Sequence, residues 1–274
     1  MHPVLFEFNT PEFLRFILPD TITIYFYGFM IASGAILGML YTQYEGKKRL
    51  DISSETIQQL VFYIILSAII GGKLFIVFED PERYTRNLSS LITNFNQGFV
   101  FYGSLLFAIP VMLIFFKWKK IPVLPMLDII AVTAVIVHSC GRIGCFMAGC
   151  CHGIPTTHFW GVTFTNPVCQ ADPLHTPLHP TQLYSFLLLV MILAILLRLN
   201  KIKKFDGQVF LTYLMLYAIG RSVIEIFRGD LSRGFVIEGI LSNSQFISLL
   251  IIIVVLIIYI RMYRKGKLRR YPKK

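Results

Sequence analysis

Long apolar stretches separated by short polar segments run through the whole chain. A helix needs about 20 apolar residues to cross a hydrocarbon core of about 30 Å. Seven stretches meet this requirement: residues 22–43, 57–78, 98–116, 123–147, 181–199, 208–227 and 244–264. No linker, low-complexity tract or internal repeat divides them. The pattern therefore predicts an all-α integral membrane protein in which residues 1–274 form one polytopic domain with seven transmembrane helices.

Composition agrees with this class, and charge gives the orientation. Hydrophobic residues make up 55% of the chain and the mean hydropathy is +0.65. Most Lys and Arg residues follow the first, third and fifth stretches or lie in residues 261–274, and basic residues are retained on the cytoplasmic side. The N-terminus is then outside and the C-terminus cytoplasmic, so residues 1–21 and the loop 148–180 are periplasmic. The basic tail 265–274 is typical of a topology anchor on anionic lipid, and no nucleic acid partner is predicted.

The N-terminal segment has its own pattern. Residues 1–21 contain acids and prolines and no basic start, so a cleavable signal peptide is not expected. Within it, residues 5–19 alternate apolar and polar groups, which is typical of a segment lying flat at the membrane interface. A short ordered turn before the first helix is the alternative.

The charged residues inside the apolar stretches fall mostly in one half of the membrane, and the predicted orientation puts four of them in the outer half: Lys73, Arg142, Arg221 and Glu225. An unpaired ion in hydrocarbon is costly, so such residues usually line a cavity. A spacing of four, four and three residues places a polar stripe on one face of the sixth helix: Tyr217, Arg221, Glu225 and Arg228. Arg221 and Glu225 can simply neutralise each other. Arginines facing a common cavity also suit an anionic phospholipid headgroup, because guanidinium donates two parallel hydrogen bonds to a phosphate.

All five cysteines and five of the six histidines fall between His138 and His179. A metal could be bound by residues of the outer loop, but their spacing is irregular, so no metal ligand is predicted: Cys150, Cys151, His152, His158, Cys169, His175 and His179. A disulfide between Cys150 or Cys151 and Cys169 is favoured, because the outer side of the membrane permits oxidation.

Two residues beside Arg142 are candidates for proton or thiol chemistry. Cys140, Cys145 and Cys150 are spaced by five residues, which rotates each by about 140° on a helix, so they do not share a face. Cys145, three residues after Arg142, is a candidate functional thiol because a nearby guanidinium favours thiolate; the alternative is a small packing residue. His138, one turn before Arg142, could accept a proton, or could be a neutral buried histidine.

Three motifs, in order along the chain, resemble those of the prolipoprotein diacylglyceryl transferase family. They are GRIGCF from Gly141, HPTQLY from His179 and YAIGRSVIEIFR from Tyr217. Further positions match residues of the family in the same order: Tyr27-Gly28, Gly71-Gly72-Lys73, Asp128 and Gln245. The resemblance covers nearly the whole chain and agrees with seven helices and an outer N-terminus.

The resemblance implies a specific reaction. Such enzymes transfer the diacylglyceryl group of phosphatidylglycerol to the lipobox cysteine thiol of a preprolipoprotein and release glycerol phosphate. It also implies a monomeric, multi-pass protein of the bacterial inner membrane, whose active site faces the periplasm and needs no cofactor. The expected partners are phosphatidylglycerol, the signal-peptide region of the preprolipoprotein and membrane lipids.

By the same resemblance, Arg142 and Arg221 would stabilise the phosphate and its developing charge, and Glu225 would orient Arg221. The catalytic candidates, from resemblance and residues together, are Arg142, Arg221, Glu225, Tyr102, Cys145 and His138. The substrate-binding candidates are Tyr27, Gly28, Lys73, Gly141, Gly144, Gly153, His179, Gln182, Tyr184, Tyr217 and Arg228. His179 could instead be a structural cap of the fifth helix.

The chain departs from the family pattern at several motif positions. Tyr102 precedes Gly103 where the family usually has a histidine, and a tyrosine with an ordinary pKa near 10 is a poor base at neutral pH. Cys145 and Cys150 stand at the usual asparagine and glutamate positions, and Ser185 replaces a glutamate. Two alternatives therefore stay open: a paralogue that transfers a phospholipid-derived group to another acceptor, and a non-catalytic phospholipid-binding membrane protein.

Overall fold

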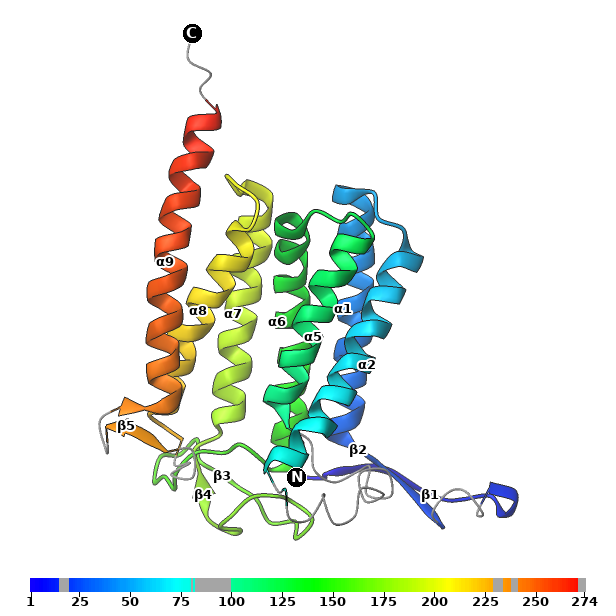
Figure 1. The fold of residues 1–274 in the computed structure, drawn as a ribbon. Coiled ribbons are helices and arrows are strands. Elements are labelled where there is room, and N and C mark those ends of the chain that lie inside the picture. Colours follow the sequence, from blue (N-terminus) through cyan, green and yellow to red (C-terminus); the bar gives the residue numbers. More distant parts are fainter. Residues whose placement is uncertain (15–19, 80, 82–99, 229–233, 238–240, 271–274) are drawn as a thin grey trace. The chain divides into compact units, whose positions relative to one another are not determined.

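The computed structural model describes residues 1–14, 20–79, 81, 100–228, 234–237 and 241–270. The described residues contain seven α-helices: α1 Phe26–Leu50, α2 Ser54–Glu79, α5 Phe101–Trp118, α6 Val123–Ala148, α7 Thr181–Ile202, α8 Gln208–Glu225 and α9 Asn243–Arg270 (Figure 1). They lie where the sequence predicts helices, and the mostly helical prediction is confirmed. The described residues also contain three short antiparallel strand pairs, one before α1, one between α6 and α7 and one between α8 and α9: β1 Val4–Asn9 with β2 Thr21–Tyr25, β3 Val162–Thr163 with β4 Pro177–Leu178, and β5 Phe235–Ile237 with β6 Leu241–Ser242.

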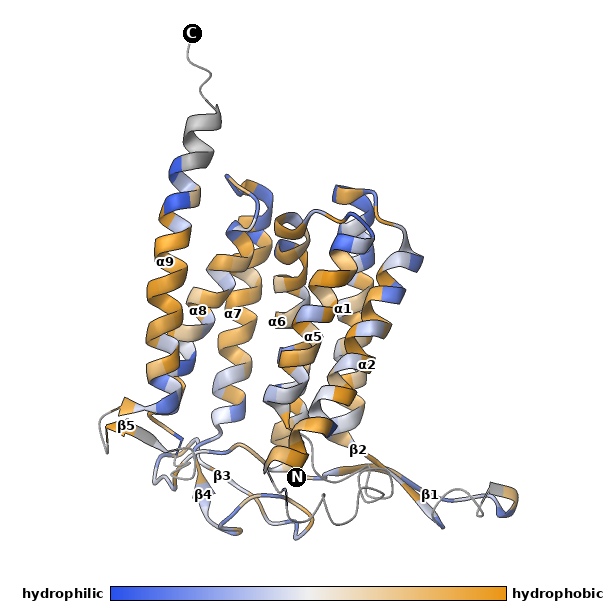
Figure 2. Ribbon diagram, in the orientation of Figure 1, coloured by the Kyte–Doolittle hydropathy of each residue, from blue (hydrophilic) through white to orange (hydrophobic). Residues whose placement is uncertain are grey.

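Four of the described helical segments are long and apolar enough to cross a membrane: Ser54–Phe78, Val123–Ala148, Thr181–Ile202 and Asn243–Arg264. Most of their length is hydrophobic (Figure 2). Many apolar side chains on these helices are exposed, including Phe62 on α2, Leu187 on α7 and Val254 on α9. A helix with an apolar exterior is suited to hydrocarbon rather than water, so the chain is a membrane protein. Seven spans and the orientation remain predictions.

The helices form two compact units. The smaller unit comprises residues Tyr41–Met126, and its centre is the packing of α2 against α5. Gly71 and Gly103 form the crossing point, because a Cβ on either glycine would overlap the backbone carbonyl oxygen of the other. Small residues of this kind let two membrane helices approach backbone to backbone. The polar start of α2 is capped by Ser53, whose Oγ accepts a hydrogen bond from the amide of Thr56 at 3.2 Å.

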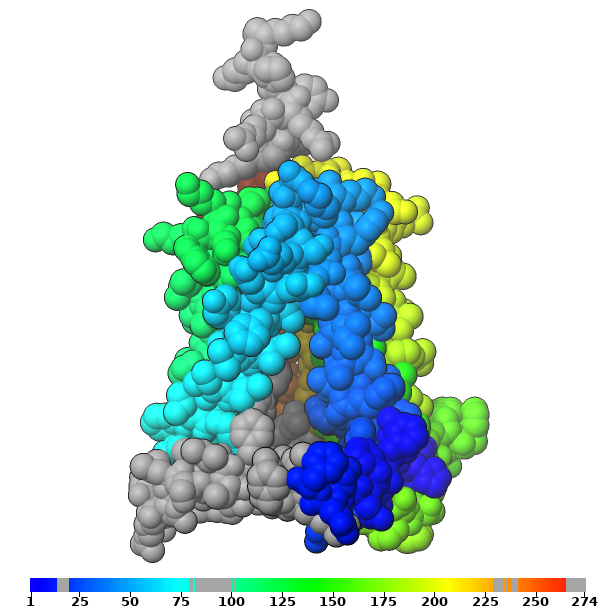
Figure 3. All heavy atoms as spheres, turned by 90° about the vertical axis from the view of Figure 1, so that its right-hand side faces the viewer, coloured from blue at the N-terminus to red at the C-terminus, as the bar shows by residue number. Residues whose placement is uncertain are grey.

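The larger unit comprises residues Met1–Leu40 and Leu127–Lys274. In it, α8 packs between α7 and α9 (Figure 1). Gly34 and Gly38 let α1 pack closely on α6, since a Cβ on them would lie 2.9 Å from Cys140 Cβ and Thr133 Cγ2, respectively. The β1–β2 pair lies at the surface of this unit, where Phe6 and Phe8 are exposed (Figure 3). The N-terminal segment thus forms a strand pair with apolar side chains outward; residues 15–19 of the predicted interfacial segment lie outside the described residues.

Asp128 on α6 fixes the start of α8 from inside the larger unit. Its fully buried carboxylate accepts hydrogen bonds from Lys203 Nζ at 2.7 Å, from the Gly207 amide at 2.9 Å and from the Phe210 amide at 3.0 Å. Helix N-termini leave amide donors unsatisfied and favour a negative charge, so this carboxylate acts as a cap donated by another helix. It sets the register between α6, which carries Arg142, and α8, which carries Arg221.

Replacing Asp128 with alanine should destabilise the larger unit. Removing one partner of a buried ion pair costs about 3–5 kcal/mol, because the other charge stays buried without compensation. The thermal unfolding midpoint of the purified protein in detergent measures this. Asp206→Ala is the matched control: Asp206 also bonds Lys203 at 2.8 Å, but its side chain is 57% exposed, so its loss should cost less than about 1 kcal/mol. Equal losses for the two variants would contradict the capping role.

Candidate functional site

Arg142 on α6 is joined to α8 through His138. Its Nε donates a hydrogen bond to His138 Nε2 at 3.1 Å, one helical turn away. The His138 ring also packs against the ring of Tyr217 on α8, with centroids 5.3 Å apart. The predicted proton acceptor therefore has its Nε2 lone pair engaged by a guanidinium. This bond holds Arg142 through its Nε.

Arg221 and Glu225 form the predicted i, i+4 ion pair on α8 through Arg221 Nη1 and Glu225 Oε2. Glu225 Oε1 lies 3.4 Å from Ser242 Oγ at the start of α9. Arg221 Nη2 is buried and has no hydrogen-bond partner among the described residues. A buried guanidinium nitrogen without a partner is costly, and an anionic ligand would satisfy it.

The charges of Arg142 and Arg221 both act on the ring of His138, and Arg228 acts on Arg221. Arg142, Arg221 and Arg228 of the larger unit are therefore close enough to interact electrostatically with a common group of residues. Glu225 is the carboxylate that pairs with Arg221. A net positive field of this kind favours a phosphate or a developing phosphate charge.

The glycines around Arg142 serve close packing against α1. A Cβ on Gly144 would lie 3.1 Å from Tyr27 Cα and Cδ2, and one on Gly141 would lie 3.1 Å from Ile31 Cδ1. Tyr27 thus covers Gly144, while 44% of it stays exposed. Gly28 differs, because nothing lies within 4 Å of the position of a Cβ there. Packing explains the glycines of α6, and Gly28 borders open space.

Residues at the start of α7 are in contact both with the 149–180 loop and with the segment that follows α8. His179 Nδ1 lies 3.0 Å from the Tyr184 hydroxyl, and the His179 ring packs on Phe227 with centroids 5.3 Å apart. Gly153 sits against the same group, since a Cβ there would overlap the carbonyl oxygen of Phe227 and lie 2.8 Å from His179 Cβ. These contacts place His179 between Tyr184 of α7 and Phe227, which follows α8; the N-cap of α7 is Pro180, and no side chain among the described residues caps this helix.

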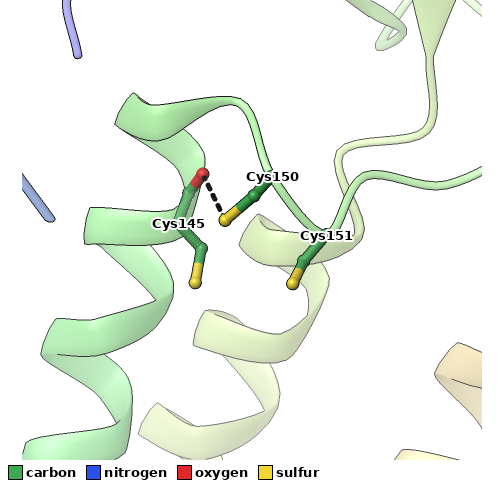
Figure 4. Close-up of side chains that lie close together, drawn as sticks. All are labelled: Cys145, Cys150 and Cys151. Carbon is green, nitrogen blue, oxygen red and sulfur yellow. Dashed lines mark hydrogen bonds between the residues drawn. The ribbon is translucent and has the colours of Figure 1, made fainter. Parts of the chain in front are cut away.

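Three cysteine sulfurs converge at the end of α6. The Sγ atoms of Cys145, Cys150 and Cys151 all lie within 4.8 Å of one another, and Cys150 Sγ donates to the Cys145 carbonyl oxygen at 3.8 Å (Figure 4). These three residues could hold a metal ion. The sequence prediction that Cys145 and Cys150 do not share a face assumed that both are helical, but α6 ends at Ala148 and the chain then turns.

The predicted disulfide of Cys150 or Cys151 with Cys169 is not present, because all five cysteines are free thiols. Cys169 is buried in an apolar cluster with Phe164 and Leu178, whereas the two vicinal thiols face Cys145 (Figure 4).

The thiols of the cluster differ in acidity. Hydrogen bonds from Cys145 and Cys150, helped by the charges of Arg228 and Arg142, lower the pKa of Cys151 below the ordinary thiol value. The neighbouring sulfurs of Cys145 and Cys151 raise the pKa of Cys150. The group therefore favours a negative charge on Cys151 next to the arginines.

The structure brings most predicted site residues into the larger unit. They come from α1, α6, the 149–180 loop, α7 and α8: Tyr27, Gly28, His138, Gly141, Arg142, Gly144, Cys145, Gly153, His179, Gln182, Tyr184, Tyr217, Arg221, Glu225 and Arg228. Tyr102 and Lys73 belong to the smaller unit, on α5 and α2. Tyr102 is 71% exposed.

Sequence reasoning missed Thr181, and it named Gln182 as a substrate-binding candidate rather than as a residue that holds the cysteine loop. Thr181 Oγ1 donates to the Cys151 carbonyl oxygen and Gln182 Nε2 to the Cys150 carbonyl oxygen, both at 2.7 Å. Both side chains are buried. The available signal was a polar pair at the first turn of an otherwise apolar helix, which has to satisfy polar groups nearby.

Comparison with known proteins gives a consistent result. A sequence model of the family described as prolipoprotein diacylglyceryl transferase matches residues 15–261. A phosphatidylglycerol–prolipoprotein diacylglyceryl transferase of Clostridium tetani is 35% identical over 97% of this chain and 100% of its own length. A Clostridium perfringens protein named as transferase 2 of this type is 32% identical over 89% of this chain and 93% of its length. The corresponding protein of Ligilactobacillus salivarius is 32% identical over 90% of this chain and 92% of its length.

Proposed function

Since the chain belongs to the prolipoprotein diacylglyceryl transferase family, and is therefore a transferase, we propose that it moves the diacylglyceryl group of phosphatidylglycerol to a lipobox cysteine thiol of a preprolipoprotein and releases glycerol phosphate. The observation that carries the proposal is the arginine group of the larger unit, in which Arg221 Nη2 is buried without a partner among the described residues and Arg142 is held through its Nε by His138. A phosphodiester is the ligand whose geometry and charge fit these donors.

The reaction breaks the bond between the diacylglyceryl carbon and a phosphate oxygen. Negative charge then grows on the leaving glycerol phosphate, and the Nη groups of Arg142 and Arg221 would stabilise it. His138 would position Arg142 through its bond to Nε, and Glu225 would position Arg221. The acceptor sulfur attacks as a thiolate, so its proton must be removed before or during attack. The predicted location is the periplasmic side of the bacterial inner membrane, where a monomer would meet both substrates.

The test is direct. Purified protein is incubated with phosphatidylglycerol vesicles and a lipobox peptide, and mass spectrometry follows the peptide while an enzymatic assay follows glycerol phosphate. We expect a diacylglyceryl mass on the peptide and an equal amount of glycerol phosphate. A peptide with serine in place of the lipobox cysteine is the control and should stay unmodified. Loss of phosphatidylglycerol with an unmodified cysteine peptide would favour another acceptor, and no change in either would favour a phospholipid-binding protein.

A further inference from the structure

The sulfur atoms of Cys145, Cys150 and Cys151 are close enough to share one ion. All three lie within 4.8 Å of one another (Figure 4). Zinc–sulfur bonds of about 2.3 Å place thiolates about 3.8 Å apart around a tetrahedral ion. Small side-chain rotations that bring the sulfur atoms up to about 1 Å closer together would therefore give the spacing of a zinc coordination shell. Three soft ligands in one place are the donor set that zinc and copper(I) select, and that calcium and magnesium do not.

The backbone that presents two of these thiols is fixed at several points. Gly149 and Cys151 adopt positive φ values of 78° and 62°, which turn the chain back toward α6. Such a conformation is uncommon for a residue other than glycine and costs about 1 kcal/mol or more at Cys151. The buried Thr181 and Gln182 hold the turned segment through the carbonyl oxygens of Cys151 and Cys150. The third thiol stands on α6, so all three ligands are presented by supported backbone.

Positive charge lies beside the cluster, because Arg142 precedes Cys145 by three residues on α6. Three thiolates with one Zn²⁺ carry a net charge of −1, and adjacent guanidinium groups offset such a charge away from bulk water.

A fourth protein ligand is not offered by the nearest described candidates. His152 Nδ1 lies 3.0 Å from the Gly153 carbonyl oxygen, and its Nε2 accepts a hydrogen bond from the Asp172 amide at 3.3 Å. Cys169 is buried among apolar side chains. Three protein ligands and one open position are the arrangement of a catalytic zinc site rather than a structural one.

We propose that Cys145, Cys150 and Cys151 bind one zinc ion, and that its open fourth position takes the cysteine thiolate of the acceptor polypeptide. The second part rests on the proposed function, whereas the first does not. Coordination deprotonates a thiol outright, and here the proton passes to solvent. This supplies the activated sulfur at a site where the Nε2 of His138 is already engaged by Arg142.

The transfer step then balances without a redox partner. An electron pair of the zinc-bound sulfur forms the carbon–sulfur bond to the diacylglyceryl group. The carbon–oxygen bond to phosphate breaks, and its electron pair leaves on glycerol phosphate beside the arginines. The product sulfur is a neutral thioether, a weaker zinc ligand than thiolate, so the modified acceptor can dissociate.

The first experiment measures metal content. Full-length protein, purified in detergent with a non-thiol reductant, is loaded with zinc chloride, freed of excess ion and analysed by elemental mass spectrometry. We expect one zinc per chain, and thiolate-to-cobalt charge-transfer absorption after loading with cobalt(II). Cys145→Ser, Cys150→Ser and Cys151→Ser should each lower zinc occupancy at least tenfold, whereas the control Cys140→Ser should keep it. Unchanged occupancy in the three variants, absence of zinc from folded protein, or copper(I) in its place would overturn the proposal.

A second measurement uses the unaltered protein, so its result does not depend on whether the cysteine variants fold. Zinc should protect three of the five cysteines from alkylation, and a chelator should expose them; identical labelling with and without zinc would overturn the site.

Adding the lipobox peptide without lipid should then change the absorption spectrum of the cobalt-loaded protein, and the serine peptide should not. An unchanged spectrum overturns acceptor coordination. None of these measurements requires lipid turnover. The zinc site and the proposed transfer reaction are therefore tested separately: zinc binding can be absent while transfer is present, and transfer can be absent while zinc is bound.

Discussion

Substituting Arg142 with lysine is expected to lower diacylglyceryl transfer about 100-fold or more while the protein stays folded. Lysine keeps the positive charge but loses the planar pair of Nη donors and the Nε that bonds His138 at 3.1 Å. Loss of one donor to a developing oxyanion typically costs a factor of about 10²–10³ in turnover. The rate of glycerol phosphate release with phosphatidylglycerol vesicles and the cysteine peptide gives the effect.

Arg198→Lys is the matched control for this experiment. The Arg198→Lys substitution makes the same chemical change at an exposed position near the end of α7. The transfer rate of this variant should therefore match that of the unaltered protein. His138→Gln should weaken transfer less than Arg142→Lys, because it removes the support of the guanidinium and not the guanidinium itself. An Arg142→Lys variant within about threefold of the normal rate would contradict a direct phosphate contact.

The helices were predictable because hydrophobic length is a strong signal in a membrane chain. The apolar stretch 181–199 becomes α7 and the stretch 208–227 becomes α8, with ends that shift by a few residues. The start of α8 is where the sequence predicts it, at Gln208, and the structure shows what fixes it. The carboxylate of Asp128 accepts hydrogen bonds from the Gly207 and Phe210 amides, and hydropathy could not reveal a contact that spans about eighty residues of sequence.

Part of the predicted polar stripe, from Tyr217 to Glu225, lies on α8 and was predictable for a related reason, whereas Arg228 lies beyond the end of the helix at Glu225. Helical spacing alone places Arg221 over Glu225, and the structure contains that ion pair. Local periodicity could not show that Glu225 also reaches Ser242, or that His138 lies between Arg142 and Tyr217, because those contacts join different helices.

The cysteine cluster was not predictable from periodicity. The 140° steps between Cys145 and Cys150 hold only while the chain is helical, and the helix ends at Ala148. A positive φ at Gly149 then returns Cys150 to the side of Cys145, and Gln182 from the next helix holds it there. The disulfide prediction was wrong as well, because Cys150, Cys151 and Cys169 are all free thiols, and the turn instead brings the two vicinal sulfurs to within 4.8 Å of that of Cys145.

Glu225→Gln and Arg221→Gln should show strongly non-additive effects on transfer. The Arg221 variant loses the buried donor Nη2, so we expect a fall of about 10²–10³-fold. The Glu225 variant keeps the guanidinium but loses the carboxylate that contacts Nη1, so we expect a smaller fall, of about tenfold or more. If Glu225 acts only by positioning Arg221, the double variant should be no slower than Arg221→Gln alone.

This double-mutant cycle separates positioning from folding. Residues that act as a unit give a coupling energy, whereas independent effects add. Thermal unfolding of the four proteins is measured beside their transfer rates, because an uncompensated buried arginine in Glu225→Gln also destabilises the fold. In the double variant neither charge remains, so stability should recover relative to Glu225→Gln while transfer stays at the level of Arg221→Gln. A double variant whose rate loss equals the product of the two single losses would show that Glu225 has a role of its own, independent of Arg221.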